Sequence, residues 1–135
     1  MRPPKIALIT LFLMVLNVET AHAQPSLESV PPVVIKTVPE AGAQAVDPGL
    51  KEIEVTFSKE MTPGSWSWGI ADKESYPKMM GDPKFLTGRR TCVLPVNLEP
   101  NKVYQIWINA QNLTNFRDMQ GRPALPYFLS FKTKP

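Results

Sequence analysis

Two aromatic side chains near the C-terminal end of the chain have the greatest capacity for binding a ligand. Trp107 stands in the run VYQIWIN and Phe128 in the run YFLSFKT, and both runs alternate as β-strands do. The apolar neighbours of each ring face the core, so both rings are predicted to leave by the opposite face. Gln105 and Asn109 share that face with Trp107. An aromatic pair flanked by amides suits a sugar ring or a protein partner.

A different interpretation of the aromatic pair is that another part of the chain covers it. The segment Ala71–Arg90 is interrupted by two prolines and two glycines and carries the apolar pairs Met79-Met80 and Phe85-Leu86. A long loop of this kind needs an apolar surface to lie on. We favour the interpretation in which it packs over Trp107, and solvent exposure of that ring distinguishes the two.

Residues that could act as nucleophile and base are few. Cys92 is the only cysteine, and the only histidine, His22, falls in a segment expected to be removed. The common nucleophile–base arrangements therefore cannot be built, and Cys92, in the run TCVLPV, is interpreted as a buried, inert thiol. Asp118 is interpreted as the cap of its own turn rather than a calcium ligand, because few acidic residues cluster near it. We expect no enzymatic activity, no metal and no cofactor.

The charge balance argues against nucleic acid as a partner. The 135 residues include 15 Lys and Arg against 12 Asp and Glu, a net charge of +3. No basic run is longer than Arg89-Arg90. A surplus this small gives no electrostatic footprint for a phosphate backbone.

Residues 1–23 have the pattern of a signal peptide. Two basic residues precede the apolar run Ile6–Val18, and Ala21-His22-Ala23 has the small residues of a cleavage site. The apolar run is shorter than the ~20 residues of a membrane-spanning helix, so an uncleaved anchor is the alternative that we disfavour. Cleavage after Ala23 predicts a secreted, periplasmic or cell-surface protein with no membrane span.

The rest of the chain reads as a short spacer, 24–32, followed by one all-β domain, 33–135. In Lys51–Phe57, the apolar residues Ile53, Val55 and Phe57 alternate with polar ones. Similar strands are expected at Val33–Val38, Ser65–Ile70, Thr91–Val96, Val103–Asn109 and Tyr127–Thr133. Short strands punctuated by turns, with no helical periodicity, predict two antiparallel sheets packed face to face. Trp68 is expected to fill the space between them.

Several short patterns occur in an order that resembles a known family. A strand ending at Pro39 leads through Gly42 to a strand that closes on Phe57-Ser58 and then Met61. Leu98-x-Pro100 precedes a Tyr-led strand, and Asp118-x-x-Gly121 forms a late turn. This succession resembles the bacterial Ig-like domain found in S-layer proteins of the SbsA type. The resemblance implies an Ig-like antiparallel β-sandwich of about seven strands.

The same resemblance implies a structural or interaction module of the cell envelope whose partner is an envelope protein or glycan. The alternative left open is a glycan- or peptide-binding protein that uses the face around Trp107. A looser likeness to periplasmic copper-resistance proteins rests on the early Pro-x-x-Gly turn and the Phe-Ser strand end. Copper sites generally need several nitrogen or sulfur ligands, and His22 offers one, so copper binding is not favoured.

Overall fold

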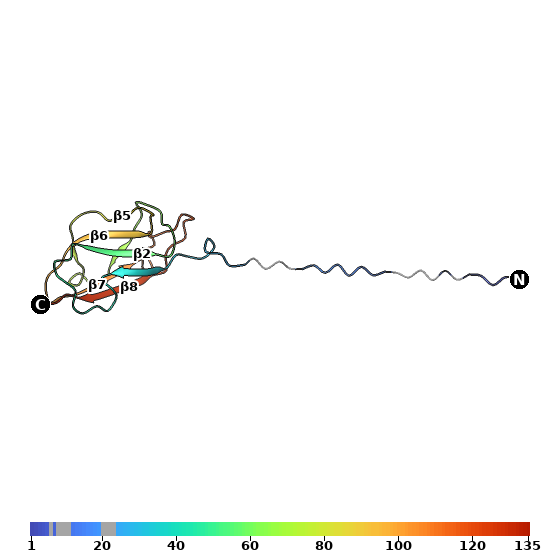
Figure 1. Ribbon diagram of the computed structural model, residues 1–135, viewed down its shortest axis with the longest axis horizontal. Coiled ribbons are helices and arrows are strands. Elements are labelled where there is room, and N and C mark those ends of the chain that lie inside the picture. The colour runs from blue at the N-terminus through green and yellow to red at the C-terminus, as the bar shows by residue number, and fades with distance from the viewer. Residues whose placement is uncertain (6, 8–11, 20–23) are drawn as a thin grey trace.

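In the computed structural model, which describes residues 1–5, 7, 12–19 and 24–135, regular structure is found only as β-strands. Figure 1 shows the N-terminal segment entering the folded part at one end and the C-terminus lying at the other. The strands are β1 (Val34–Val38), β2 (Glu52–Phe57), β3 (Trp68–Ile70), β4 (Lys78–Met79), β5 (Lys84–Phe85), β6 (Thr91–Asn97), β7 (Val103–Ile108) and β8 (Tyr127–Lys132). The expected all-β fold is confirmed.

The first sheet is antiparallel and has the order β1-β2-β6-β4, with β5 also paired to β6. Opposite Ile53 lies Leu94, and opposite Val55 lies Cys92, so the apolar faces of β2 and β6 coincide. All four side chains are fully buried. The alternation that predicted the inward face of β2 therefore holds across the neighbouring strand as well.

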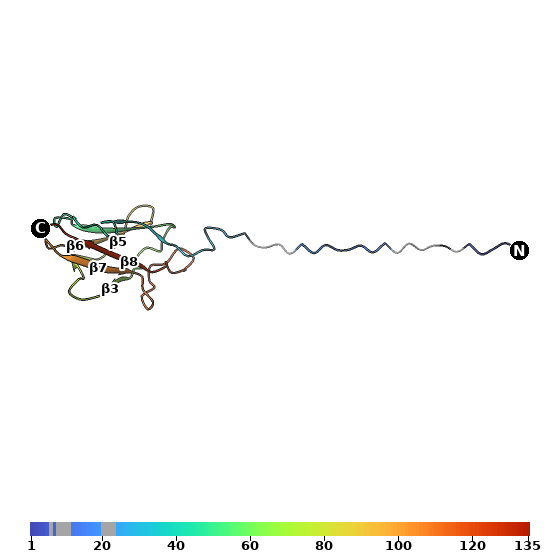
Figure 2. The same cartoon turned by 90° about the horizontal axis from the view of Figure 1, so that it is seen from below.

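The second sheet, β3-β7-β8, is antiparallel and lies against the first, and Figure 2 shows the two layers. The open edge of β8 is partly covered, because the chain leaves β1 and passes from the first sheet to the second. The Gly42 amide donates to the Ser130 carbonyl at 2.7 Å, and the Lys132 amide donates to the Ala43 carbonyl at 2.8 Å. This edge is therefore closed to any further strand between Ser130 and Lys132.

The centre of the core is a residue outside the strands. The ring of Phe116 is fully buried, and its centroid lies 5.0 Å from that of Phe57, 5.5 Å from that of Trp68 and 6.3 Å from that of Phe85. Trp68 is only 9% exposed, which confirms its expected place between the sheets. Phe116 belongs to a stretch rich in polar residues, and its burial was not predicted.

Two expectations about the connecting segments are corrected. From β4 onward, the segment Ala71–Arg90 does not form a loop over the second sheet, because β4 and β5 pair one after the other with β6 of the first sheet. The segment 24–32 is not a free spacer throughout, because Pro32 is buried and its carbonyl accepts from the Leu125 amide at 3.1 Å. Folded structure thus begins before residue 33.

The signal-peptide pattern falls in part on residues that the structure does not describe. The cleavage pattern Ala21-His22-Ala23 and residues 6 and 8–11 of the apolar run lie outside the described ranges. No helix within those ranges has the length and apolar character that a membrane crossing requires. Export and cleavage therefore stay predictions.

The buried face of β2 can be tested by comparing Phe57→Ala with Glu54→Gln. Phe57 is fully buried against Phe116, whereas Glu54 points to the outer face of the sheet. We expect Phe57→Ala to lower the free energy of unfolding by about 3–5 kcal/mol and Glu54→Gln to change it by less than about 0.5 kcal/mol. Urea unfolding of both variants measures this, and equal losses would contradict the register.

Candidate functional site

The outer face of the second sheet carries the aromatic pair that the sequence predicted. Trp107 and Phe128 are directly paired across β7 and β8, with ring centroids 4.9 Å apart and ring planes at 49°. Phe128 is 40% exposed, and Trp107 is partly buried. The prediction that these two rings meet on the outer face is confirmed. Their use in binding a ligand stays a prediction.

The interpretation that Ala71–Arg90 covers the pair is wrong for the part of the segment from β4 onward. Its strands β4 and β5 lie in the first sheet, and its Phe85 ring points inward to Phe116. Beside Trp107 on the neighbouring strand is Gly69. A Cβ atom placed on Gly69 would lie 2.9 Å from Leu113 Cδ1 and 3.0 Å from Trp107 Cβ, so the glycine leaves room for the Leu113 side chain at this position.

Gln105 lies on the same outer face as Trp107, as predicted. It is directly opposite Ser130 and is partly buried. Its side-chain Oε1 lies 3.4 Å from the Ser75 hydroxyl, a long hydrogen bond, and its backbone amide donates to the Ser75 carbonyl at 2.9 Å. The side-chain NH₂ group of Gln105 is thus the part of this residue that can serve a ligand.

Asn109 does not belong to this face, and its predicted role beside Trp107 is wrong. It is fully buried and has a φ of 53°, a left-handed conformation that ends the alternation of β7. Its Nδ2 donates to the carbonyls of Phe116, at 2.9 Å, and Ala124, at 3.0 Å, while its Oδ1 accepts from the Phe116 amide at 3.0 Å. Asn109 therefore satisfies the backbone of a buried segment that has no strand partner.

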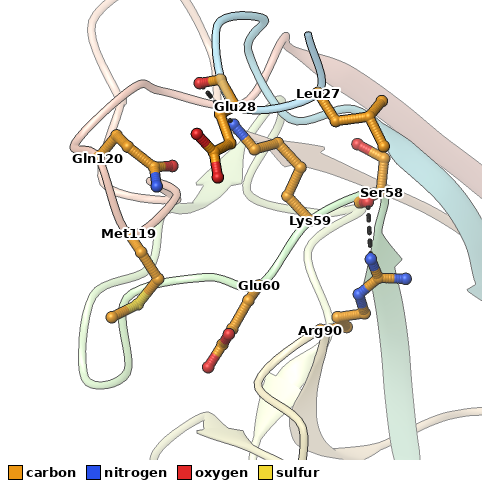
Figure 3. A pocket seen from close by; sticks show the side chains of 8 residues that line it. All are labelled: Leu27, Glu28, Ser58, Lys59, Glu60, Arg90, Met119 and Gln120. Atoms are coloured by element: carbon orange, nitrogen blue, oxygen red, sulfur yellow. Dashed lines mark hydrogen bonds between the residues drawn. The ribbon is translucent and has the colours of Figure 1, made fainter.

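A second candidate site is a surface depression of about 220 Å³ at the end of the domain where the N-terminal segment enters (Figure 3). Its walls come from the end of β2, the N-terminal segment and the turn after Phe116. The lining residues are Leu27, Glu28, Ser58, Lys59, Glu60, Arg90, Met119 and Gln120. A buried lysine beside such a hollow raises the question of an anion site.

Lys59 has no donor left for an anion. Its ammonium group donates to Asp118 Oδ2 at 2.6 Å and to the carbonyls of Val30, at 3.0 Å, and Glu28, at 3.3 Å. An ammonium group has three donors, and these three acceptors use them all. The role of Lys59 is therefore structural: it ties the N-terminal segment to the domain.

Asp118 is held by the same junction. Its side chain is fully buried, and its Oδ1 accepts from the amides of Gln120, at 3.0 Å, and Arg122, at 2.8 Å. Burial by itself raises the pKa of Asp118, but the hydrogen bond from Lys59 and those from the turn outweigh it and bring the pKa below its usual value. The interpretation of Asp118 as a turn cap is confirmed, and its ion pair with Lys59 is an addition that the sequence did not reveal.

Cys92 and the possible metal ligands give no sign of a reactive centre. Burial is the main cause that raises the pKa of the Cys92 thiol to about 12. A thiol in this state is not a nucleophile at neutral pH. Among the described residues, no three His, Cys, Asp or Glu side chains are grouped so that they could hold a metal ion. His22 lies outside those residues.

Comparisons with known proteins agree with this architecture. A family model described as a bacterial Ig-like domain matches residues 28–133. Domains 1–6 of the surface layer protein SbsC superimpose with a TM-score of 0.50 and 18% identity over 79% of this chain, which amounts to 14% of that one. A crystal structure of the S-layer protein rSbsC gives a TM-score of 0.49, 18% identity and coverage of 78% and 14%. A search among curated proteins found no match. Similarity at this identity concerns the fold alone.

The Lys59–Asp118 pair predicts a specific pattern of destabilisation. Asp118→Asn keeps an oxygen for the turn amides but leaves the Lys59 charge buried without a counter-ion, and we expect a loss of about 3–5 kcal/mol in the free energy of unfolding. The double variant Lys59→Met, Asp118→Asn removes that uncompensated charge and should recover part of the loss. If the loss in the double variant equals the sum of the losses in Lys59→Met alone and Asp118→Asn alone, the two side chains do not interact.

The same pair predicts how stability depends on pH. Because the folded-state pKa of Asp118 lies below the unfolded value of about 3.9, the pair's contribution is complete above about pH 4. It is lost as the pH falls through the folded-state pKa. Thermal melts should show a wild-type stability that drops in this acid range by more than that of Asp118→Asn. Parallel losses in the two proteins would contradict the assignment.

Proposed function

Because the chain belongs to the bacterial Ig-like domain family, we propose that it is an exported, non-catalytic structural or interaction module of the bacterial cell envelope. In this proposal, residues 1–23 are the signal peptide, removed after Ala23, and the domain acts in the periplasm, at the cell surface or after secretion. Its partner is an envelope protein or glycan. The match of the family model over residues 28–133 carries the proposal.

The state of the buried polar groups supports a module without catalysis. Lys59 and Asp118 hold the N-terminal segment and a turn, and Asn109 holds the backbone around Phe116. Thr133 accepts from the Lys102 amide at 2.9 Å and donates to the Glu99 carbonyl at 2.6 Å. Catalytic groups are kept available to a substrate and have their pKa tuned for proton transfer. These buried groups instead form hydrogen bonds that join segments of the chain. Any ligand or partner would therefore bind to surface residues.

A second candidate function, the binding of a glycan or peptide, is favoured by the exposure of the aromatic pair. Trp107 and Phe128 lie on the outer face of β7 and β8, and no strand of the Ala71–Arg90 segment covers them. Contiguous exposed aromatic surface is a common mark of an interaction site. This candidate is compatible with an envelope module, because it names the surface that such a module would use.

Export is tested by recovery of the protein from its native host. Cell fractionation should place it in the periplasm, at the surface or in the medium, and mass spectrometry should find Gln24 as its first residue, since Ala21-His22-Ala23 precedes it. Substitution of Ala23 by a bulky residue such as Phe should retard cleavage. Recovery of a mature cytoplasmic protein that begins at residue 1 would refute export.

The exposure of Trp107 is tested by iodide quenching of tryptophan fluorescence. Trp107→Phe should reduce the readily quenched part of the signal, of which Trp66 supplies the rest because it is also partly exposed, and should change the free energy of unfolding by less than about 1 kcal/mol. Trp68→Phe is the matched control: Trp68 is buried, so its loss should lower stability and spare the quenched part. If Trp107→Phe leaves quenching unchanged, the ring is shielded and the second candidate function fails.

A further inference from the structure

The aromatic pair is one end of a row of three cross-strand pairs on the outer face of the second sheet. The pairs follow one another in register along β7 and β8, and they are Trp107 with Phe128, Gln105 with Ser130, and Val103 with Lys132. The first pair and the last are four residue steps apart along the strand, a length of about 13 Å. The row changes from aromatic, through an amide and a hydroxyl, to a cation. Its ends therefore offer different chemistry to one extended ligand.

A hollow of about 260 Å³ lies at the cationic end of the row. It forms where the segment that includes Gly42 and Gln44 runs along the edge of β8, and Ser130 and Lys132 line its other side. Gly42 has a φ of 83°, and a Cβ atom placed on it would meet nothing within 4 Å, so this wall is open. The hollow thus adds a recess with an amide, a hydroxyl and an ammonium group to the flat aromatic end.

The charge at this end is positive and not neutralised by the protein. The Lys132 side chain is exposed, and the ion pairs found among the described residues involve Lys59, Arg89 and Lys102 instead. The six residues of the row include no Asp or Glu. An anionic group on a ligand would therefore meet Lys132 without a competing carboxylate from the row.

From these observations we propose that the row binds a linear acidic glycan. The faces of the sugar rings stack on Trp107 and Phe128, and their hydroxyl groups bond to the Gln105 amide and the Ser130 hydroxyl. The carboxylate of a uronic acid unit lies in the hollow against Lys132. This inference rests on the second candidate function and narrows it to one class of ligand.

Other occupants fit the row less well. An extended peptide commonly binds by adding a strand to a sheet edge, but the edge of β8 between Ser130 and Lys132 is already paired with the Gly42–Val46 segment. A second copy of the chain would place Lys132 within a protein interface, whose core is depleted of lysine. An acidic glycan instead uses the aromatic, amide and ammonium groups together.

The test compares two probes on the same sugar chain, one with charged carboxylates and one with neutral methyl esters: a short oligogalacturonate and its methyl ester. Calorimetric titration of the protein, in the form that its host cell produces, should give binding of the acid about fivefold tighter than that of the ester at low salt. This preference should shrink as salt rises. Trp107→Ala should weaken both probes at least tenfold, whereas Lys132→Gln should abolish the preference and leave the ester unaffected.

Lys36→Gln is the matched control, because Lys36 is an exposed lysine on β1 of the other sheet and should have no effect. If both probes bind equally well and both depend on Trp107, the proposal that the ligand is acidic is wrong, but the row is still a glycan-binding face. Binding of neither probe, or binding insensitive to Trp107→Ala, would overturn the glycan assignment. Sedimentation that shows a dimer dispersed by Trp107→Ala would overturn it in favour of a second copy. None of these results bears on export, which fractionation tests separately.

Discussion

The burial of Phe116 is the constraint on which the rest of this domain depends. Its ring joins Phe57 of the first sheet to Trp68 of the second, although it comes from a connection without strand structure. A connection of this kind can enter a core only if its backbone groups find partners. Asn109 provides partners for both the amide and the carbonyl of Phe116. The Ser67 hydroxyl accepts from the amide of Asn115, the residue before Phe116, at 3.0 Å. Two buried polar residues therefore allow one aromatic ring to close the sandwich.

The position of Phe116 also fixes the end of the domain where the chain enters. Asp118, two residues later, bridges to Met61 beyond β2 and takes the ammonium group of Lys59. Lys59 in turn holds the carbonyls of the N-terminal segment. Residues that carried the family resemblance in the sequence, Phe57, Met61 and Asp118, thus meet at one place. Their common role is to join three segments, which explains why Lys59 offers no free donor to a ligand in the depression there.

Because the buried polar side chains are engaged in joining segments, the differences between the outer faces of the two sheets decide where binding can occur. The Ala71–Arg90 segment extends the first sheet through β4 and β5, so these two strands do not cover the second sheet. The Gly42–Val46 segment protects the edge of β8 but not its face. What stays accessible is a row with aromatic, amide and cationic groups on a rigid sheet. A rigid surface loses little conformational entropy on binding, which suits an interaction module.

The sequence by itself determined which face of β2, β6, β7 and β8 is apolar, and so it placed Trp107 with Phe128 outside; in β3 the alternation fails, since Trp68 is buried but Ile70 is exposed. That much follows from alternation, a property of each strand's own backbone. The sequence did not determine that Phe116 is buried, that Asn109 turns inward or that Lys59 pairs with Asp118. Only the tertiary structure decided which sheet β4 and β5 would join, and hence whether Trp107 would be covered. These outcomes depend on contacts between segments as far apart as residues 59 and 118, and no local pattern records which distant partner satisfies a polar group or covers a ring.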